Sequence, residues 1–226
     1  MRPTKCGWVV ALAAALFAAP PTAAQTSPGS EQLPEAIPIF PLPDMTLFPN
    51  STQPFHIFEP RYRAMIADAL AGDSIIGMVM LQPGYEQEYE GRPPIYDLGC
   101  AGRIVASEQL PDGRYNIALQ GLTKFRVVSE DQSRSYRLAS VEELPESEVG
   151  DPDALASRRR QVEGAVRLAF PRAPLPSSGL PDDRAIDDLS IMLPLEPAER
   201  LELLEADGPV ERASILVRLL RRGAPL

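Results

Sequence analysis

Three groups of residues have types and spacings that could carry chemistry, and the first surrounds the chain's only histidine. His56 has Ser51 before it and Glu59 after it. A nucleophile, a base and an orienting carboxylate are the parts of a serine hydrolase site. The three residues are neighbours in sequence, but no oxyanion-hole motif accompanies them. A Ser/His hydrolase is therefore an alternative and not the leading hypothesis.

The second group surrounds Lys124, the only lysine after Lys5. With Thr123 beside it or Ser129 nearby, Lys124 raises the question of a hydroxyl–lysine dyad. The surrounding residues alternate in the manner of a strand, in which adjacent side chains point to opposite faces. We therefore do not expect such a dyad.

The third group is acidic and could attract a metal ion. It consists of Asp182, Asp183, Asp187 and Asp188. Metal sites need several histidines or cysteines, or clustered carboxylates, and a capped, solvated helix face explains these four aspartates better. No GxxxxGK[ST] loop is present to hold the phosphates of ATP. We predict no catalytic residues, no metal and no cofactor.

The stretch from Ile37 to Gly72 organises the first half of the chain. It reads IPIFPLPDMTLFPNSTQPFHIFEPRYRAMIADALAG. A helix is predicted to start at Pro60 and to stop at Gly72. Its apolar face consists of Tyr62, Met65, Ile66, Ala69 and Leu70, which recur at helical spacing.

Two short strands are expected before this helix. Ile37–Leu42 contains prolines that cannot donate to a ladder, which predicts an edge strand. Thr46–Phe48 is predicted to be a second strand, closed by a turn at Pro49-Asn50. Arg61 is two residues from Glu59, so we expect it to point away from Glu59 and to pair with a carboxylate or carbonyl of the barrel.

The runs IPIFPLPDMTLFP and PFHIFEPRYRAMI resemble the opening of the Lon protease N-terminal domain, the substrate-binding module of that family. The run LPLEPAERLELLEADGPVERASILVRLL is similar to the family's helical half. The resemblance implies a PUA-like pseudobarrel, and a role in gripping exposed apolar segments of other proteins or in mediating assembly. The chain departs from the full protease, since it has no phosphate loop and lacks the domain that holds the family's catalytic serine and lysine.

The rest of the chain supports this fold. Further strands are predicted at Ser74–Leu81, Ile95–Leu110, Tyr115–Gln120, Leu122–Val128 and Tyr136–Val141, with a long loop at Gln82–Pro94 that is either solvated or a recognition surface. Such strands, with one helix after the second, suit a closed antiparallel barrel. Asp151-Pro152 starts a helix, and Asp182 or Asp183 is expected to cap a later one.

The predicted fold class is α+β: a PUA-like antiparallel β pseudobarrel with one inserted helix, followed by a small α-helical bundle. The predicted domains are a signal peptide (1–24), a linker (25–36), the barrel (37–146) and the bundle (151–226).

The start of the chain predicts export. Arg2 and Lys5 precede an apolar run at Gly7–Ala19, and small residues end at Ala24, as in a secretory signal peptide. We therefore expect a periplasmic or secreted protein, with an uncleaved membrane anchor as the alternative. Cleavage leaves Cys100 as the one cysteine, so no intramolecular disulfide is expected.

The charge of the chain narrows its partners. The net charge is −9, and loss of Arg2 and Lys5 with the signal peptide makes it −11. An acidic protein repels phosphate backbones and anionic lipid surfaces. We therefore expect no nucleic acid as a partner and no strong membrane association after cleavage.

The leading functional hypothesis is a non-catalytic polypeptide-binding module. Its partners would be unfolded or client polypeptides, with a separate protease as a further candidate. An edge strand open to strand addition and the aromatic side chains of Phe48, Phe55, Phe58 and Tyr62 support this hypothesis, although for any single one of these aromatic residues a place in the core is the better explanation. A small ligand in the barrel mouth is a second alternative. The candidate binding residues are Phe48, Phe55, His56, Phe58, Glu59, Arg61 and Tyr62.

Overall fold

The computed structural model describes residues 32–85 and 91–223, and the residues from Leu33 onward form one compact unit. The strands are β1 (Ala36–Leu42), β2 (Thr52–Ile57), β3 (Ile75–Leu81), β4 (Ile95–Gln109), β5 (Tyr115–Asp131) and β6 (Arg137–Leu144). The helices are α1 (Pro60–Ala71), α2 (Pro152–Ala169), α3 (Asp182–Met192), α4 (Pro197–Glu205) and α5 (Pro209–Gly223). The predicted signal peptide, the start of the predicted linker and the middle of the predicted loop at 82–94 lie outside the described residues.

Five of the strands close into a barrel. The hydrogen-bonded order is β5-β4-β3-β1-β6, and β6 pairs again with β5, while β2 is attached to β5 alone. The predicted α+β class is confirmed. One pairing differs from an all-antiparallel barrel, because β1 and β3 run parallel. Parallel neighbours need a long crossover connection, and the segment that contains β2 and α1 supplies it.

The inside of this barrel is narrow and is filled by one aromatic ring. Phe125 on β5 is fully buried with Ile37 and Ile39 of β1. A Cβ atom built on Gly77 or Gly99 would lie 2.7 Å from the Phe125 ring. These two glycines therefore make room for Phe125.

The predicted strand at Ile37–Leu42 is present as β1, but its predicted position at the sheet edge and the predicted strand at Thr46–Phe48 are wrong. β1 is not an edge strand, because its first half pairs with β6 and its second half with β3. Pro38 and Pro41 are tolerated there because each half of the strand has one neighbour only. Thr46–Phe48 is not a strand. The strand after the turn, at Thr52–Ile57, pairs with β5 instead.

The helices start largely where the sequence predicts. In α1 the buried side chains are those of the predicted apolar face, apart from partly exposed Leu70. Asp151 caps α2 by accepting hydrogen bonds from the backbone N–H groups of Asp153 and Ala154. The predicted cap of α3 is wrong, because Pro181 occupies the N-cap position and Asp182 is already helical.

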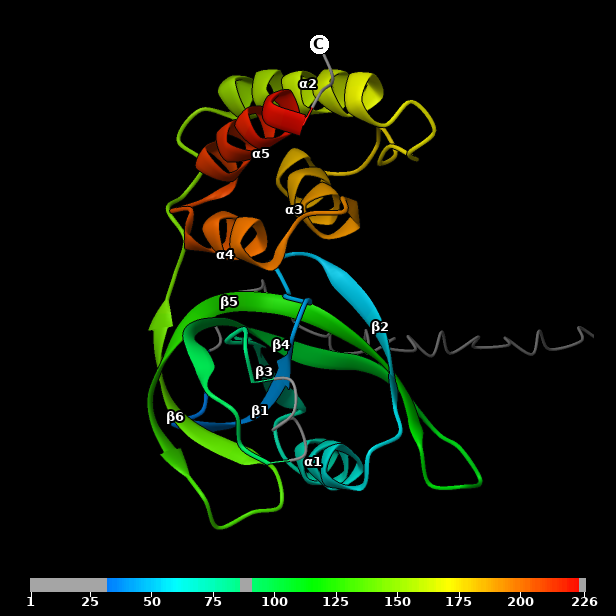
Figure 1. Ribbon diagram of the computed structural model, residues 1–226, viewed down its shortest axis with the longest axis vertical. Coiled ribbons are helices and arrows are strands. Elements are labelled where there is room, and N and C mark those ends of the chain that lie inside the picture. Colours follow the sequence, from blue (N-terminus) through cyan, green and yellow to red (C-terminus); the bar gives the residue numbers. More distant parts are fainter. Residues whose placement is uncertain (1–31, 86–90, 224–226) are drawn as a thin grey trace, which may run out of the picture. The chain divides into compact units, whose positions relative to one another are not determined.

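The helices α2–α5 gather at one end of the barrel and α1 lies at the other (Figure 1). No helix among the described residues has the length and apolar character that a bilayer span requires. The predicted division between 37–146 and 151–226 follows the change from strands to helices, and as a domain boundary it stays a prediction.

Candidate functional site

The edge strand of this sheet is β2. In the described part of the chain it is hydrogen-bonded to β5 and to no other strand. The backbone N–H of Gly121 donates to the carbonyl of Ser51 at 2.9 Å, directly before β2 begins. Because backbone groups alternate along a strand, those of Thr52, Pro54 and His56 point to the open side. Within residues 32–85 and 91–223, no strand pairs with the carbonyl and N–H groups on this side of β2, and Pro54 has no N–H.

The exposed end of β2 carries an aromatic pair. Phe58 is 61% exposed, and its ring stacks on the ring of His56 with 6.4 Å between centroids. His56 Nδ1 donates to Asn116 Oδ1 at 2.8 Å, and its Nε2 accepts from Arg114 Nη1 at 3.2 Å. The orientation of Asn116 follows from its amide Nδ2, which donates to Glu108 Oε2. His56 is thus held in place as support for Phe58.

The other predicted aromatic residues lie inside the protein. Phe48 is fully buried, and Tyr62 is nearly so. Phe55 is half-buried and contacts Phe40 edge to face at 5.7 Å, and Phe40 in turn contacts Tyr62 at 4.8 Å. Phe58 and His56 therefore remain as the exposed aromatic members of the predicted set.

Glu59 and Arg61 pair with each other, so the prediction that Arg61 points away from Glu59 is wrong, whereas its predicted bond to a carbonyl of the barrel is found at Gly91. Arg61 Nε donates to Glu59 Oε2 at 2.9 Å, and Arg61 also lies over the ring of Tyr62 at 4.6 Å. The two side chains meet because Glu59 is the N-cap residue, whose extended backbone does not follow helical spacing. Arg61 Nη1 also donates to the carbonyl of Gly91, so Arg61 ties the start of α1 to the segment before β4.

The hydrolase alternative lacks its central contact. The buried hydroxyl of Ser51 donates to the carbonyl of Phe48 at 2.7 Å. Both ring nitrogens of His56 are bonded to Asn116 and Arg114. Nucleophile and base therefore do not form the hydrogen-bonded pair that a serine hydrolase requires.

The predicted acidic group lies on α3, and its aspartates have different surroundings. Asp182 pairs with Arg159 at 2.9 Å, and Asp188 lies 3.9 Å from Arg184. Asp187 is fully buried, so the expected solvated helix face is wrong for this residue. Among residues 32–85 and 91–223, no three His, Cys, Asp or Glu side chains are grouped so that they could hold a metal ion.

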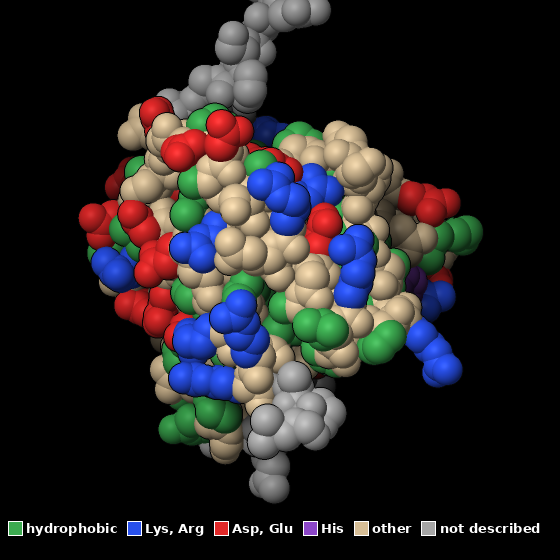
Figure 2. Space-filling view, turned by 90° about the horizontal axis from the view of Figure 1, so that it is seen from above, with side chains coloured by type: hydrophobic (Ala, Val, Ile, Leu, Met, Phe, Trp, Pro, Cys, Tyr) green, Lys and Arg blue, Asp and Glu red, His purple; other side chains and the backbone are tan. Residues whose placement is uncertain are grey.

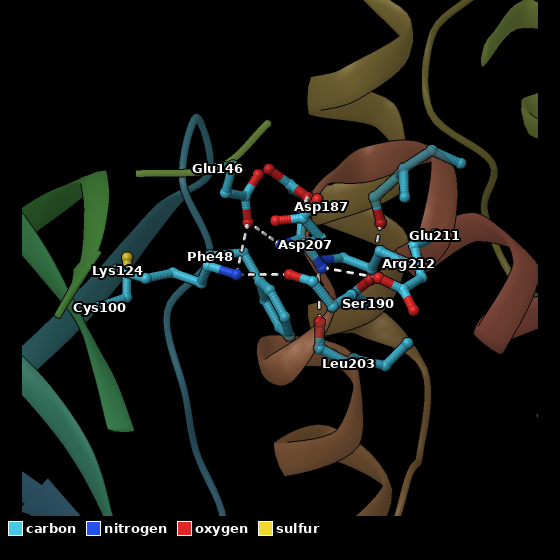
Figure 3. Close-up of polar contacts among 12 residues, drawn as sticks. Phe48, Cys100, Lys124, Glu146, Asp187, Ser190, Leu203, Asp207, Glu211 and Arg212 are labelled. Carbon is cyan, nitrogen blue, oxygen red and sulfur yellow. Dashed lines mark hydrogen bonds and ion pairs between the residues drawn. The ribbon is translucent and has the colours of Figure 1, made fainter. Parts of the chain in front are cut away.

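A buried network of charges joins the barrel to the helices (Figure 3). Arg212 on α5 is fully buried and donates to the carboxylates of Asp187 on α3 and Glu146 after β6. Lys124 on β5 lies 3.7 Å from Glu146 and donates to the carbonyl of Ala206. Lys124 is thereby assigned to this network.

Burial sets the electrostatics of the network. Loss of water raises the pKa of Asp187 to about 7, although Arg212 acts in the opposite direction. Burial also lowers the pKa of Lys124, against the pull of Glu146. Arg212 loses water too, but Asp187 and Glu146 outweigh this effect and raise its pKa. The nearby Cys100 thiol is fully buried, and burial raises its pKa, so it is not a reactive nucleophile.

Sequence analysis missed this network, although a signal was present. Arg212 precedes Leu216, Leu219 and Leu220 at helical spacing, so it lies on the apolar face of its helix. A charge in that position predicts a buried partner, because an unpaired buried charge is strongly unfavourable. The partner's identity depends on α3, which only the fold brings close.

Two apolar hollows bear on the small-ligand alternative. One of about 430 Å³ lies where β1 and β3 end, and its lining includes Leu81, Tyr85 and Pro197. Another of about 690 Å³ lies between α2 and α3, and its lining includes Phe170 and Leu193. Both fall in the size range of ligand pockets. The predicted ligand site was the barrel mouth, and binding of a small ligand in the barrel mouth stays a prediction.

Comparison with known proteins identifies relatives of this fold. A crystal structure of a Lon N-terminal domain protein from Xanthomonas campestris matches with a TM-score of 0.57 and 23% identity, over 81% of this chain and 97% of that chain. The N-terminal domain of Lon protease from the Mycobacterium avium complex matches with a TM-score of 0.58 and 18% identity, over 82% and 98%. At these identities the structures establish the shared fold.

The sequence comparisons point to the same family. Lon protease 2 of Myxococcus xanthus is 29% identical over 202 residues, which are 85% of this chain and 24% of that protein. The chain thus spans about a quarter of the length of such relatives. The family model of the ATP-dependent protease La (Lon) substrate-binding domain matches residues 36–222. This chain therefore belongs to the family of the Lon substrate-binding domain.

Proposed function

We propose that this protein binds exposed segments of other polypeptides along the open side of β2. The observation that carries the proposal is that, in the part of the chain that the structure describes, β2 has a hydrogen-bonded strand neighbour on one side only, with the exposed ring of Phe58 at its end. Membership of a substrate-binding family supports the class of partner. The apolar ring and the open backbone together suit a chain that is extended and partly hydrophobic.

The mode of binding is strand addition. A client segment lies beside β2 and hydrogen-bonds to the outward groups of Thr52 and His56 and to the carbonyl of Pro54. Phe58 covers an apolar side chain of the client. Pro54 offers no donor, so the ladder has a gap, and a gap of this kind limits indiscriminate pairing between edges.

The proposed role is non-catalytic. The family match is to a substrate-binding domain, and the hydroxyl and imidazole groups of the candidate hydrolase residues are engaged elsewhere. A client held on β2 would be released unchanged or passed to a separate protease. The net charge of −9 favours clients with basic segments.

The first test removes the exposed ring. Phe58→Ala is expected to weaken binding of a fluorescent, permanently unfolded polypeptide about tenfold, since a few aromatic anchors contribute much of the energy of an interface. Fluorescence anisotropy gives the dissociation constant. The matched control is Val128→Ala, because Val128 is 65% exposed on the part of β5 that does not pair with β2.

Strand addition is tested separately with the client. Short apolar peptides that are N-methylated at alternate positions cannot complete a ladder, and they should bind more weakly than the unmethylated peptides. Equal affinity for methylated and unmethylated peptides would rule out strand addition. If Phe58→Ala and Val128→Ala weaken binding of the unfolded polypeptide equally, β2 is not the binding site.

We propose also that the protein acts after export, which rests on the signal-like residues 1–24. Expression in the native envelope should give a mature chain that begins near Gln25. N-terminal sequencing of the protein from the periplasmic and culture fractions measures this. Intact Met1 in a cytoplasmic fraction would overturn the localisation and leave the binding proposal standing.

A further inference from the structure

One face of the helical region has a hollow lined with arginines. Arg218, Arg221 and Arg222 follow Ser214 at helical spacing on α5, and Arg158 on α2 also lines the hollow, together with Gln161 and Val217. The hollow measures about 450 Å³. Figure 2 looks onto this helical end, where basic side chains gather across the face and acidic side chains collect along one side. The arginines line a concave surface that an inserted side chain could fill.

Most of this positive charge is not compensated within the described residues. Arg218 pairs with Glu202 of α4. The ion pairs among the described residues do not include Arg158, Arg221 or Arg222, and Arg158 donates only to the neutral Gln161 at 3.1 Å. Arg221 and Arg222 in the last turn of α5 also interact favourably with the negative end of the helix dipole. That effect does not account for Arg158, which belongs to a different helix.

An acidic hollow adjoins the arginine hollow, and Ser214 lines both. The acidic hollow measures about 360 Å³, and Glu148, Asp207 and Glu211 contribute to its lining. Glu211 and Arg221 are ten residues apart on α5, which corresponds to about 15 Å along a helix. The surface therefore changes sign over a distance that a short peptide spans.

This change of sign narrows the class of partner. A long polyanion such as RNA would extend from the arginines to the acidic hollow, where the carboxylates would repel it. The net charge of −9 adds to this repulsion. An anionic membrane would meet the same repulsion. A second copy of the chain would place its own concave surface against this one, and neither hollow would be filled by a side chain. A short polypeptide segment with charges of both signs satisfies both hollows.

We propose that this face of α5 and α2 binds a polypeptide segment that places carboxylates in the arginine hollow and a basic side chain near Glu148. Guanidinium and carboxylate groups match as bidentate pairs. The acidic hollow also contains Glu211, which lies about 15 Å from Arg221 along α5. An extended segment that spans this distance has its two charged groups about four to five residues apart, at about 3.3 Å per residue. The inference takes only the class of partner from the proposed polypeptide binding and uses a different face of the protein.

The test uses labelled peptides and the full protein. One peptide carries Glu-Glu and Lys-Lys separated by four serines, and two others replace either the glutamates or the lysines by glutamine. We expect the first to bind about tenfold more tightly than the peptide without glutamates, and we expect 0.5 M NaCl to reduce the difference, since salt screens exposed charges. Fluorescence anisotropy measures each dissociation constant.

Variants of the protein assign the two ends. Arg221→Gln/Arg222→Gln should abolish the preference for glutamate, whereas Glu148→Gln should abolish the preference for lysine. The matched control is Arg160→Gln/Arg167→Gln, which removes the same charge from exposed positions of α2 outside the hollow. The inference would be overturned if all three peptides bind with equal affinity, or if the control variant loses as much peptide affinity as the test variants. Tighter binding of single-stranded RNA or of anionic vesicles than of the first peptide would also overturn it.

The two binding proposals fail independently. Phe58→Ala should weaken the unfolded apolar client and leave the charged peptides unaffected, whereas Arg221→Gln/Arg222→Gln should do the reverse. Loss of charged-peptide binding in Phe58→Ala would show that the peptides bind at β2, and it would overturn the present inference alone.

Discussion

Arg212→Ala is expected to lower the free energy of unfolding by about 3–5 kcal/mol, the cost of breaking a buried ion pair. Arg212 is fully buried and binds Asp187, Glu146 and the carbonyl of Leu203. Its guanidinium also lies 5.0 Å from the ring centroid of Phe48, which belongs to the segment before β2. Removing the cation leaves Glu146 with Lys124 as its positive partner, and it leaves Asp187 without an ion-pair partner among the described residues. Chemical denaturation followed by fluorescence or circular dichroism measures the loss.

The control for this variant is another ion pair of the same helix. Arg218 and Glu202 are paired but partly exposed, at 36% and 42% of their side chains. Exposed pairs contribute about 0–1 kcal/mol, so Arg218→Ala should cost far less than Arg212→Ala. Similar losses in the two variants would show that the buried network does not hold the helices to the barrel.

The same network should make stability depend on pH. Burial raises the pKa of Asp187 from 3.8 to about 7, so the folded protein binds this proton more tightly than the unfolded chain does. The stability contributed by Asp187 is therefore present below about pH 4 and falls as the pH rises toward 7. Asp187→Asn should flatten this slope. The loss in Arg212→Ala should be smaller at pH 5 than at pH 8, because Asp187 is neutral at the lower pH.

Gly121→Ala is expected to lower the free energy of unfolding by about 3 kcal/mol, at the upper end of the cost of overpacking. An added Cβ would lie 2.0 Å from the carbonyl oxygen of Phe48. That oxygen belongs to the backbone, so no change of rotamer relieves the clash. Gly121 also exchanges hydrogen bonds with Asn50 and Ser51 at the start of β2, so the edge strand should loosen as well. Thermal and chemical unfolding measure the effect.

Gly164→Ala is the matched control for the glycine substitution. Gly164 lies within α2, and nothing is within 4 Å of the Cβ that alanine would add. Alanine at such a position should stabilise the helix by about 0.5–1 kcal/mol. If both variants lose a comparable free energy of unfolding, the close approach of the Phe48 backbone is not the reason for glycine at position 121.

Local patterns were sufficient for much of the fold. The helix start at Pro60 and the start of α2 at Asp151-Pro152 follow from proline and capping preferences that act within a few residues. The helix also stops at Gly72 as predicted, but Gly72 has a φ of −114° and does not adopt the left-handed conformation that favours glycine. Gly121 shows the limit of such patterns. It was expected to separate two strands, whereas β5 runs through it without a break because the glycine admits a neighbouring backbone.

The neighbours of each strand were beyond the reach of local patterns. The prolines of β1 correctly indicate missing donors, but they do not say that each half of the strand has a different partner. The edge strand of the sheet is β2 and not β1. Phe55 and His56 of β2 were predicted as binding residues because of their aromatic rings. Which rings are core and which are exposed depends on the side from which β5 and α1 approach.

The family, the class of fold and the positions of most helices could be predicted from continuous segments, because the spacing of apolar residues and the capping residues are properties of such segments. The tertiary structure decided which strand is the edge, that Phe58 is exposed while Phe48 is core, and that Arg212 meets Asp187 and Glu146. These outcomes rest on contacts between segments far apart in the chain. The free energy of burying a charge or a ring depends on all of its neighbours together, and only the folded chain assembles them.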